Sequence, residues 1–111
     1  MNQNYFTEIA KRASKKIYPA ADDFERQSDY KIDSKWINEL ALLTQVVKKD
    51  HEICYAHGRI LYSLIRKKIS SSKDFKNICI FETGTARGFS SLCMAKALDD
   101  SNTIGKIITL D

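Results

Sequence analysis

The residues with the clearest chemical potential occupy positions 82–90, with the sequence ETGTARGFS. An apolar run precedes them and a helical pattern follows, so they are expected to form the turn between the end of a strand and the start of a helix. The first N–H groups of a helix have no intrahelical partners and carry partial positive charge, so such a turn can hold a carboxylate or a phosphate. Gly84 and Gly88 would let the backbone bend sharply and let a ligand approach it closely.

Two nucleotide-binding motifs are incomplete in this turn. A dinucleotide fingerprint needs G-x-G-x-x-G, and counting from Gly84 the chain supplies Ala86 and Phe89 in place of the second and third glycines. The third glycine allows close packing of the helix on the strand, so its replacement matters most. A phosphate-binding P-loop needs a lysine, which residues 82–90 lack. An NAD(P)-binding oxidoreductase stays open as an alternative, with an incomplete motif.

Two acidic residues narrow the choice of ligand. The carboxylate of Glu82 at the end of a strand would repel a pyrophosphate and would suit a cationic group. Asp111 follows a second apolar run and could accept hydrogen bonds from both hydroxyls of a ribose. A ligand with a ribose, an ammonium or sulfonium centre and a carboxylate would suit Asp111, Glu82 and the start of the helix, respectively. S-adenosylmethionine has these groups.

The same residues carry a resemblance to a known family. Residues 78–98, ICIFETGTARGFSSLCMAKAL, resemble motif I of the class I (Rossmann-like) S-adenosylmethionine-dependent methyltransferases, with an E-x-G-x-x-x-G core. Asp111 resembles the acidic residue that ends their second strand, and the preceding helical region, including YAHGR at 55–59, resembles that of the catechol O-methyltransferase-like small-molecule branch. The resemblance covers residues 35–111 well and the first 34 poorly. Ala86 stands where many members carry a glycine.

The resemblance implies a cofactor site and an activity. The residues that would bind S-adenosylmethionine are Glu82, Gly84, Thr85, Ala86, Gly88, Ser90 and Asp111. Glu82 would contact the amino end of the methionine moiety, Ser90 its carboxylate and Asp111 the ribose hydroxyls. The implied function is methyl transfer to a small molecule, with an O-methyltransferase favoured. The family's positions that recognise adenine, and those that carry metal ligands or a general base, have no counterparts in the chain, so no catalytic residues are assigned. Methyltransferase turnover by these 111 residues is expected to be negligible.

The turn needs a strand before it and a helix after it. The run 78–81 (ICIF) is expected to be a parallel strand covered on both faces. A helix is predicted by apolar residues at i, i+3, i+4 and i+8, namely Phe89, Leu92, Cys93 and Ala97. The run 107–110 (IITL) predicts a second strand. Strand, helix and strand together have the usual size of one βαβ unit.

Three helices are expected before this unit. The first has an apolar stripe formed by Phe6, Ile9, Ala13 and Ile17, and it ends before Pro19. A polar connector is expected over 22–33. Asp33 or Ser34 then offers an N-cap for a helix with the stripe Trp36, Leu40, Leu43 and Val47. The third helix carries Ile53, His57, Ile60, Leu61, Leu64 and Ile65 on one face and closes at the basic residues 66–68 and the serines 70–72.

The predicted fold class is therefore α/β, with N-terminal helices followed by the first βαβ unit of a Rossmann-like methyltransferase sheet. Residues 1–34 form an N-terminal helix and polar connector, and residues 35–111 form the helical lead-in and the βαβ unit. Two parallel strands leave open edges and a half-covered core, so we expect the front portion of a larger protein or a truncated product. The open edges favour a homo-oligomer. A non-catalytic remnant that acts as an interaction module is a third alternative.

Composition excludes several other classes of protein. The net charge is +4, and much of the basic excess lies at Lys48, Lys49 and residues 66–68, where cations complement the ends of helices. No aromatic residues interleave with them, so a nucleic-acid partner is not expected. No apolar run approaches the roughly 20 residues of a membrane span, and no secretory signal is visible. A cytoplasmic protein without a membrane partner is predicted.

The cysteines and histidines predict structural roles. Cys54, Cys79 and Cys93 form no CxxC pair and are expected to be buried thiols in a reducing compartment. His51 and His57 match no zinc motif, so no metal site is predicted, and His57 is expected to be a core or boundary residue. A glycine inside a helix, as at position 58, costs about 1 kcal/mol relative to alanine and indicates close packing or a nearby cofactor edge.

Overall fold

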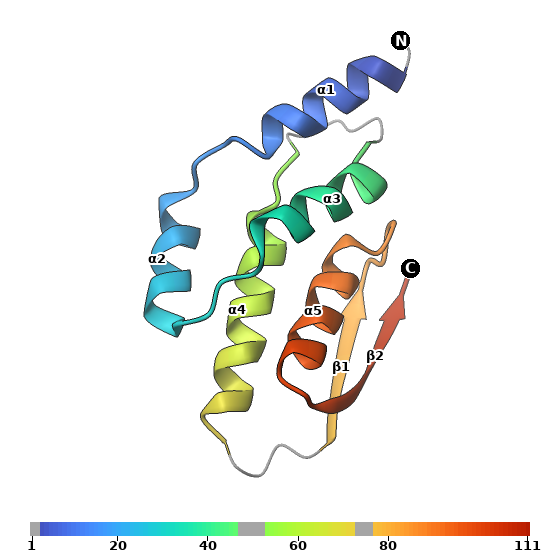
Figure 1. Cartoon of the computed structure of the whole chain (residues 1–111). Helices are drawn as coiled ribbons and strands as arrows, with labels where there is room; N and C mark the ends of the chain where they lie inside the picture. The colour runs from blue at the N-terminus through green and yellow to red at the C-terminus, as the bar shows by residue number, and fades with distance from the viewer. Residues whose placement is uncertain (1–2, 47–52, 73–76) are drawn as a thin grey trace.

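The computed structural model describes residues 3–46, 53–72 and 77–111, so Val47, Lys48, Lys49 and His51 lie outside the described residues. The elements are α1 (Gln3–Ala13), α2 (Pro19–Ser28), α3 (Ser34–Thr44), α4 (Ala56–Ser70), β1 (Asn77–Thr83), α5 (Phe89–Asp100) and β2 (Ile104–Leu110). From left to right in Figure 1, α2, α4, α5 and the two strands lie in succession, and α3 contacts α1 and α5. Helices and a parallel sheet are thus combined in an α/β arrangement. Within the described ranges, no helix combines the length and the apolar character that crossing a bilayer requires.

The N-terminal region holds two helices where the sequence predicted one helix and a connector. The helix α1 ends at Ala13, so Ile17 lies beyond it with 80% of its surface exposed, and the predicted stripe is wrong at that end. The connector predicted over 22–33 is also wrong, because α2 continues to Ser28. Pro19 begins α2, since its fixed φ and missing N–H suit the first helical position.

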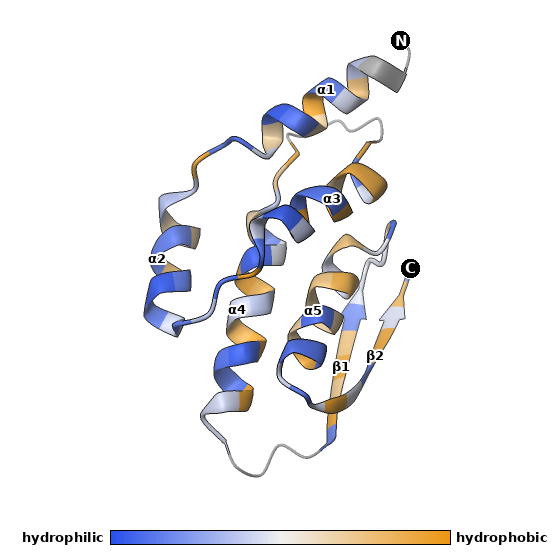
Figure 2. Cartoon of the chain, in the orientation of Figure 1, coloured by the Kyte–Doolittle hydropathy of each residue, from blue (hydrophilic) through white to orange (hydrophobic). Residues whose placement is uncertain are grey.

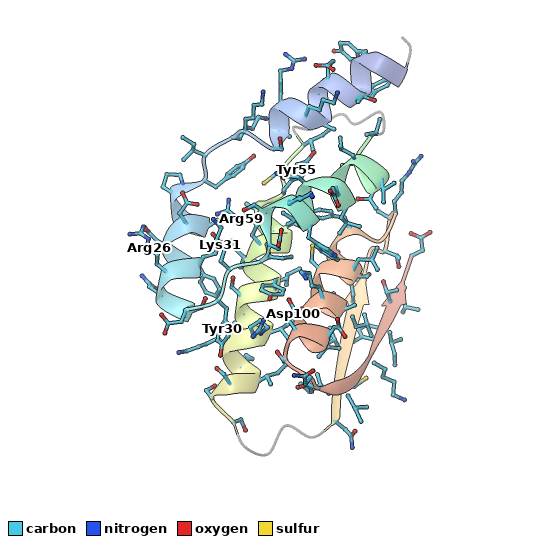
Figure 3. All side chains as sticks on the ribbon, in the orientation of Figure 1. Arg26, Tyr30, Lys31, Tyr55, Arg59 and Asp100 are labelled. Atoms are coloured by element: carbon cyan, nitrogen blue, oxygen red, sulfur yellow. The ribbon has the colours of Figure 1, made fainter. Side chains whose placement is uncertain are left out.

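The acidic residues of α2 bind α4. Arg59 of α4 donates hydrogen bonds to Glu25 from Nε, at 3.0 Å, and from Nη2, at 2.5 Å. Its Nη2 also donates to Asp22 Oδ1 at 2.6 Å. Only 5% of Glu25 is exposed, so this ion pair is largely removed from water. Figure 3 shows Arg59 between the two helices. Charged residues that suggest a solvated connector in the sequence therefore form a helix interface.

The helix α3 begins at the predicted cap, and its buried face agrees with the predicted stripe at Trp36 and Leu40 but not at Leu43. The side chain of Asp33 accepts a hydrogen bond from Trp36 N at 3.0 Å, which confirms the N-cap. The buried residues of α3 are Ile37, Leu40, Ala41 and Thr44. Leu43, assigned to the stripe from the sequence, is 78% exposed. Ala41, which the predicted stripe leaves out, is fully buried.

Close packing of α4 on α5 forms the centre of the core and explains why a glycine occupies position 58 inside a helix. A Cβ at this glycine would lie 2.7 Å from Phe89 Cε1 and 2.8 Å from Cys93 Sγ. Both of these side chains are buried in the core, so the glycine is required by helix packing. His57 is exposed, with its ring centroid 5.0 Å from that of Phe89, so it lies at the boundary of the core. Ile53 is buried as expected, although α4 begins only at Ala56.

The strands β1 and β2 are parallel, and α5 connects them, as the sequence predicted. Ile80 pairs with Ile107 and Glu82 with Thr109. Alternate residues of β1 are half-buried and exposed, so one face of the sheet packs on α5 and the other is open. The prediction of a strand covered on both faces is therefore wrong for the described residues, since Phe81 is 61% exposed.

The open face also corrects the prediction for the cysteines. Cys93 lies in the core, where burial raises the pKa of its thiol to about 12. Cys54 is only partly buried, and Cys79 is exposed on the open face of the sheet. The prediction of buried thiols is confirmed for Cys93 and is wrong for Cys79.

Candidate ligand-binding site

The turn from β1 to α5 has the open, glycine-dependent backbone that the sequence predicted. Gly84 and Gly88 have φ of +81° and +90°, a region that disfavours side chains. A Cβ built at either position would find no other atom within 4 Å among the described residues. Gly84 N donates to Leu110 O at 2.6 Å and Gly88 N to Thr85 O at 2.9 Å, which fixes the course of the turn. The backbone is thus shaped by two glycines and is accessible from outside.

Ala86 lies at the tip of this turn in a costly conformation. Its φ is +47°, in the left-handed region, which costs a residue with a Cβ roughly 1–2 kcal/mol. Such local strain persists where the surrounding structure determines the backbone, and it is common at ligand-binding turns. The neighbouring Arg87 is exposed. The tip therefore presents backbone groups and one cationic side chain to solvent.

The carboxylate of Glu82 is held by three hydroxyl groups. Ser90 Oγ donates to its Oε2, and Ser91 Oγ donates to its Oε1. Thr109 Oγ1 on the paired strand also donates to Oε1, at 3.0 Å. Because that hydroxyl has a single proton, the 2.6 Å contact between Thr85 Oγ1 and Thr109 Oγ1 has Thr85 as donor. A continuous chain of hydroxyls therefore fixes the orientation of the carboxylate.

These contacts keep Glu82 ionised. Burial by itself would raise the pKa of the carboxyl group, because it disfavours the charged form. The hydrogen bonds from Ser90, Ser91 and Thr109, together with the charge of His57, outweigh burial and lower the pKa below its ordinary value. At neutral pH the site therefore contains a fixed negative charge.

The N-terminal end of α5 places partial positive charge beside the carboxylate of Glu82. Gly88 is the N-cap residue, in the left-handed conformation, and no side chain caps the helix. The bond from Leu92 N to Gly88 O, at 2.9 Å, belongs to the first turn of the helix. The N–H groups of residues 89–91 precede it and have no acceptor within the helix. Glu82 itself complements the helix dipole, so its carboxylate stabilises α5 as well as charging the site.

Asp111 completes the set of predicted residues at this end of the sheet. Leu110 pairs with Thr83, and its carbonyl accepts from the N–H groups of both Gly84 and Thr85, so the chain reaches Asp111 alongside the turn. Asp111 is exposed. The structure thus brings the predicted residues to the carboxyl ends of both strands: Glu82, Gly84, Thr85, Ala86, Gly88, Ser90 and Asp111. Parallel α/β sheets commonly bind ligands at this edge.

Ser90 has a contact that the sequence did not indicate. Its hydroxyl is bonded to Glu82, so the contact with a ligand carboxylate that the resemblance implies stays a prediction. Sequence reasoning missed Ser91 and Thr109. Thr109 could have been found from strand alternation, because it has the same register as Glu82 on the neighbouring strand. Ser91 could have been found from its position in the first turn of the helix.

A separate cavity of about 190 Å³ lies away from the turn, among the first four helices. Its lining includes Tyr18, Lys31, Tyr55 and Arg59, the last three of which are labelled in Figure 3. The guanidinium of Arg59 is already bonded to two carboxylates, and Tyr55 Oη donates to Ala10 O at 2.6 Å. These polar groups hold the helices together, so the turn remains the stronger candidate for ligand binding.

Comparison of the chain with models of known protein families, with curated proteins and with solved structures found no significant match.

Proposed function

We propose that the chain binds S-adenosylmethionine at the carboxyl ends of β1 and β2, and that it is the cofactor-binding part of a small-molecule methyltransferase with a Rossmann-like sheet. An O-methyltransferase is the favoured type. The observation that carries the proposal is the ionised, hydroxyl-bonded carboxylate of Glu82 beside the start of α5, which no side chain caps. A ligand with a cationic centre and a carboxylate is complementary to this pair of charges.

The residues present fit this cofactor. The fixed charge of Glu82 suits its ammonium and sulfonium groups, and the N–H groups at the start of α5 suit its carboxylate. Gly84 and Gly88 leave open space beside the backbone. Asp111 lies at the end of the adjacent strand, where a carboxylate can accept hydrogen bonds from a ribose. When bound, S-adenosylmethionine supplies a methyl group activated by its sulfonium centre.

The contribution of these residues is positioning. Glu82 cannot turn away easily, because hydroxyls from α5 and β2 hold both carboxylate oxygens. A binding group held in place before the ligand arrives loses less conformational entropy on binding. Methyl transfer depends strongly on such alignment, since it is an in-line displacement. The methyl acceptor remains a prediction from the resemblance.

The packing of Phe89 favours S-adenosylmethionine over a dinucleotide. Phe89 occupies the third glycine position of the dinucleotide fingerprint, and it is only 3% exposed in the contact between α4 and α5. The start of α5 is therefore packed around a large side chain and not around the glycine that a pyrophosphate site uses. The negative charge of Glu82 adds repulsion toward a pyrophosphate.

Isothermal titration calorimetry with S-adenosylmethionine, NAD and NADP tests the proposal. We expect S-adenosylmethionine to bind the wild-type chain. Glu82→Gln should weaken that binding roughly tenfold or more, as for the loss of a charged hydrogen-bonding partner. Glu39→Gln is the matched control, because Glu39 is exposed on α3, and it should bind like wild type. Circular dichroism would confirm that each variant is folded.

Three outcomes would contradict the proposal. Binding of NAD without binding of S-adenosylmethionine would favour the oxidoreductase alternative. Binding of neither ligand by the folded chain would favour an interaction module. Equal loss of affinity in Glu82→Gln and Glu39→Gln would place the ligand elsewhere.

A further inference from the structure

His57 lies beside the proposed cofactor site, on an element that holds none of the predicted site residues. It is the second residue of α4, and its ring centroid is 5.0 Å from that of Phe89, the first residue of α5. The side chain of His57 is exposed. Figure 1 shows that α4 and α5 both begin on the side toward which the arrows of β1 and β2 point. The imidazole therefore lies at the edge of the turn, beside the start of α5.

The packing of α4 on α5 fixes this position. A Cβ at Gly58, the next residue of α4, would lie 2.7 Å from Phe89 Cε1, so the two helices are in close contact here. The first turn of α5 also carries Ser90 and Ser91, whose hydroxyls bind Glu82. The imidazole of α4 and the carboxylate of β1 thus both lie against the first turn of α5.

The charge of His57 acts on Glu82. Burial raises the pKa of Glu82, whereas the three hydroxyl groups and the positive charge of His57 lower it below its ordinary value. Figure 2 shows that the arrowhead of β1 is hydrophilic, while most of the rest of the strand is hydrophobic. The carboxylate therefore ends an apolar strand, where charges interact more strongly than they do in bulk water.

Few other ionisable groups surround the start of α4. Arg59 binds the two carboxylates of α2, and the first turn of α5 has no ionisable side chain. Burial raises the pKa of Cys93 to about 12 and the pKa of Tyr55 above its ordinary value. Arg87 in the turn and Asp111 after β2 are exposed. An imidazole is the side chain that ordinarily changes charge between pH 5 and 8, so it is the group here that is suited to respond near neutral pH.

We propose that His57 is a residue of the cofactor site and that its proton competes with S-adenosylmethionine for Glu82. The protonated imidazole pairs with the carboxylate and repels the ammonium and sulfonium groups of the ligand. The neutral imidazole leaves the carboxylate to the ligand. S-adenosylmethionine therefore binds the form with neutral His57, and binding releases a proton from the imidazole. This inference rests on the proposed function and adds a residue of α4 to the same site.

The size of the effect follows from the fraction of neutral imidazole. An imidazole that titrates near pH 6.5 is about one-tenth neutral at pH 5.5 and about three-quarters neutral at pH 7. Apparent affinity falls in proportion to the binding-competent fraction, so binding should tighten about five- to tenfold over this range. The α-amino group of the ligand stays largely charged in the same range, because such groups ordinarily titrate near pH 8.

Isothermal titration calorimetry of the full chain with S-adenosylmethionine at pH 5.5 and pH 7 tests the proposal. The dissociation constant of wild type should fall about five- to tenfold from the lower to the higher pH. His57→Asn, which is always neutral, should change by less than about twofold. His57→Lys, which is always charged, should bind at pH 7 at least about fivefold more weakly than wild type. Circular dichroism at both pH values would confirm that each variant is folded.

Proton release is a second readout, which a purely structural role of His57 would not produce. Titrations at pH 6 in two buffers of different ionisation enthalpy give the number of protons released for each ligand bound. Wild type should release roughly 0.5–0.8 proton, and His57→Asn should release almost none. The matched control is His51→Asn, which removes the only other histidine of the sequence and should keep both the pH dependence and the proton release.

The possible outcomes separate this inference from the proposed function. Wild-type binding with equal affinity at pH 5.5 and pH 7 would overturn the inference alone, as would a pH dependence that persists in His57→Asn. Loss of the pH dependence in His51→Asn would also overturn it. No binding of S-adenosylmethionine at either pH would contradict the proposed function, and this inference with it.

Discussion

Substitution of Gly58 by alanine tests whether α4 and α5 pack as closely as the structure shows. Alanine is the better helix former by about 1 kcal/mol, so the change would stabilise α4 if the space beside the glycine were open. The added Cβ would instead lie 2.7 Å from Phe89 Cε1 and 2.8 Å from Cys93 Sγ. These side chains are 3% and 0% exposed, so neither can move into solvent.

The expected effect follows from these two opposing contributions. Forcing an extra carbon into a packed core costs about 1–3 kcal/mol, and contact with two buried side chains favours the upper half of that range. After the gain in helix propensity, Gly58→Ala should lower the free energy of unfolding by about 1–2 kcal/mol. Phe89→Leu removes the nearer ring atoms. The double variant should therefore be more stable than the sum of the single effects by about 1 kcal/mol.

Urea unfolding followed by the fluorescence of the single tryptophan, Trp36, measures these differences. Trp36 packs against the core, so its emission reports loss of tertiary structure. If Gly58→Ala raised the free energy of unfolding by about 1 kcal/mol, and its effect were additive with that of Phe89→Leu, the close packing of the two helices would be refuted.

Three further predictions follow from the described contacts. Arg59→Met should lower the free energy of unfolding in urea by about 3–5 kcal/mol, because it leaves Glu25 buried without a partner. Arg26→Met removes an exposed ion pair and should lower it by less than about 1 kcal/mol. Equal effects of the two substitutions would contradict the buried ion pair. Ala86→Gly should leave the free energy of unfolding unchanged or raise it by up to about 1 kcal/mol, because glycine adopts the φ of +47° without the strain of a Cβ. A clearly lower midpoint of thermal unfolding would be inconsistent with a positive φ at this residue. Burial and a hydrogen bond to a carboxylate raise the pKa of Tyr62 from 10.0 to about 12, so its contribution to stability is complete below pH 10 and is lost as the pH rises through 12. The stability advantage of wild type over Tyr62→Phe should shrink across that range, and a constant difference would count against the shift.

The βαβ unit could be predicted because its signals are local. Two short apolar runs flank a segment with helical periodicity, and each element can be recognised from its own residues. The glycines of the turn are equally local, since Gly84 and Gly88 both have a positive φ that glycine adopts readily. The Rossmann-like continuation of the sheet stays a prediction from the resemblance.

The features that the sequence did not predict depend on distant partners. The acidic residues of α2 suggest a solvated connector until Arg59, more than thirty positions away, is placed against Glu25. An apolar run such as ICIF is the same whether one face of its strand is covered or both, so the open face could not be inferred from residue types. The hydroxyl contacts of Glu82 likewise depend on the register that sets Thr109 opposite it.

The most direct test of the proposed cofactor site is an amide NMR titration of the ¹⁵N-labelled chain with S-adenosylmethionine. We predict saturable shifts of the amide signals of Gly84, Thr85 and Gly88 and of the first turn of α5, with little change in α2. Shifts confined to the amide signals of residues that line the cavity among the first four helices would contradict the assignment of the turn as the binding site. The absence of any shift at millimolar S-adenosylmethionine would contradict it as well.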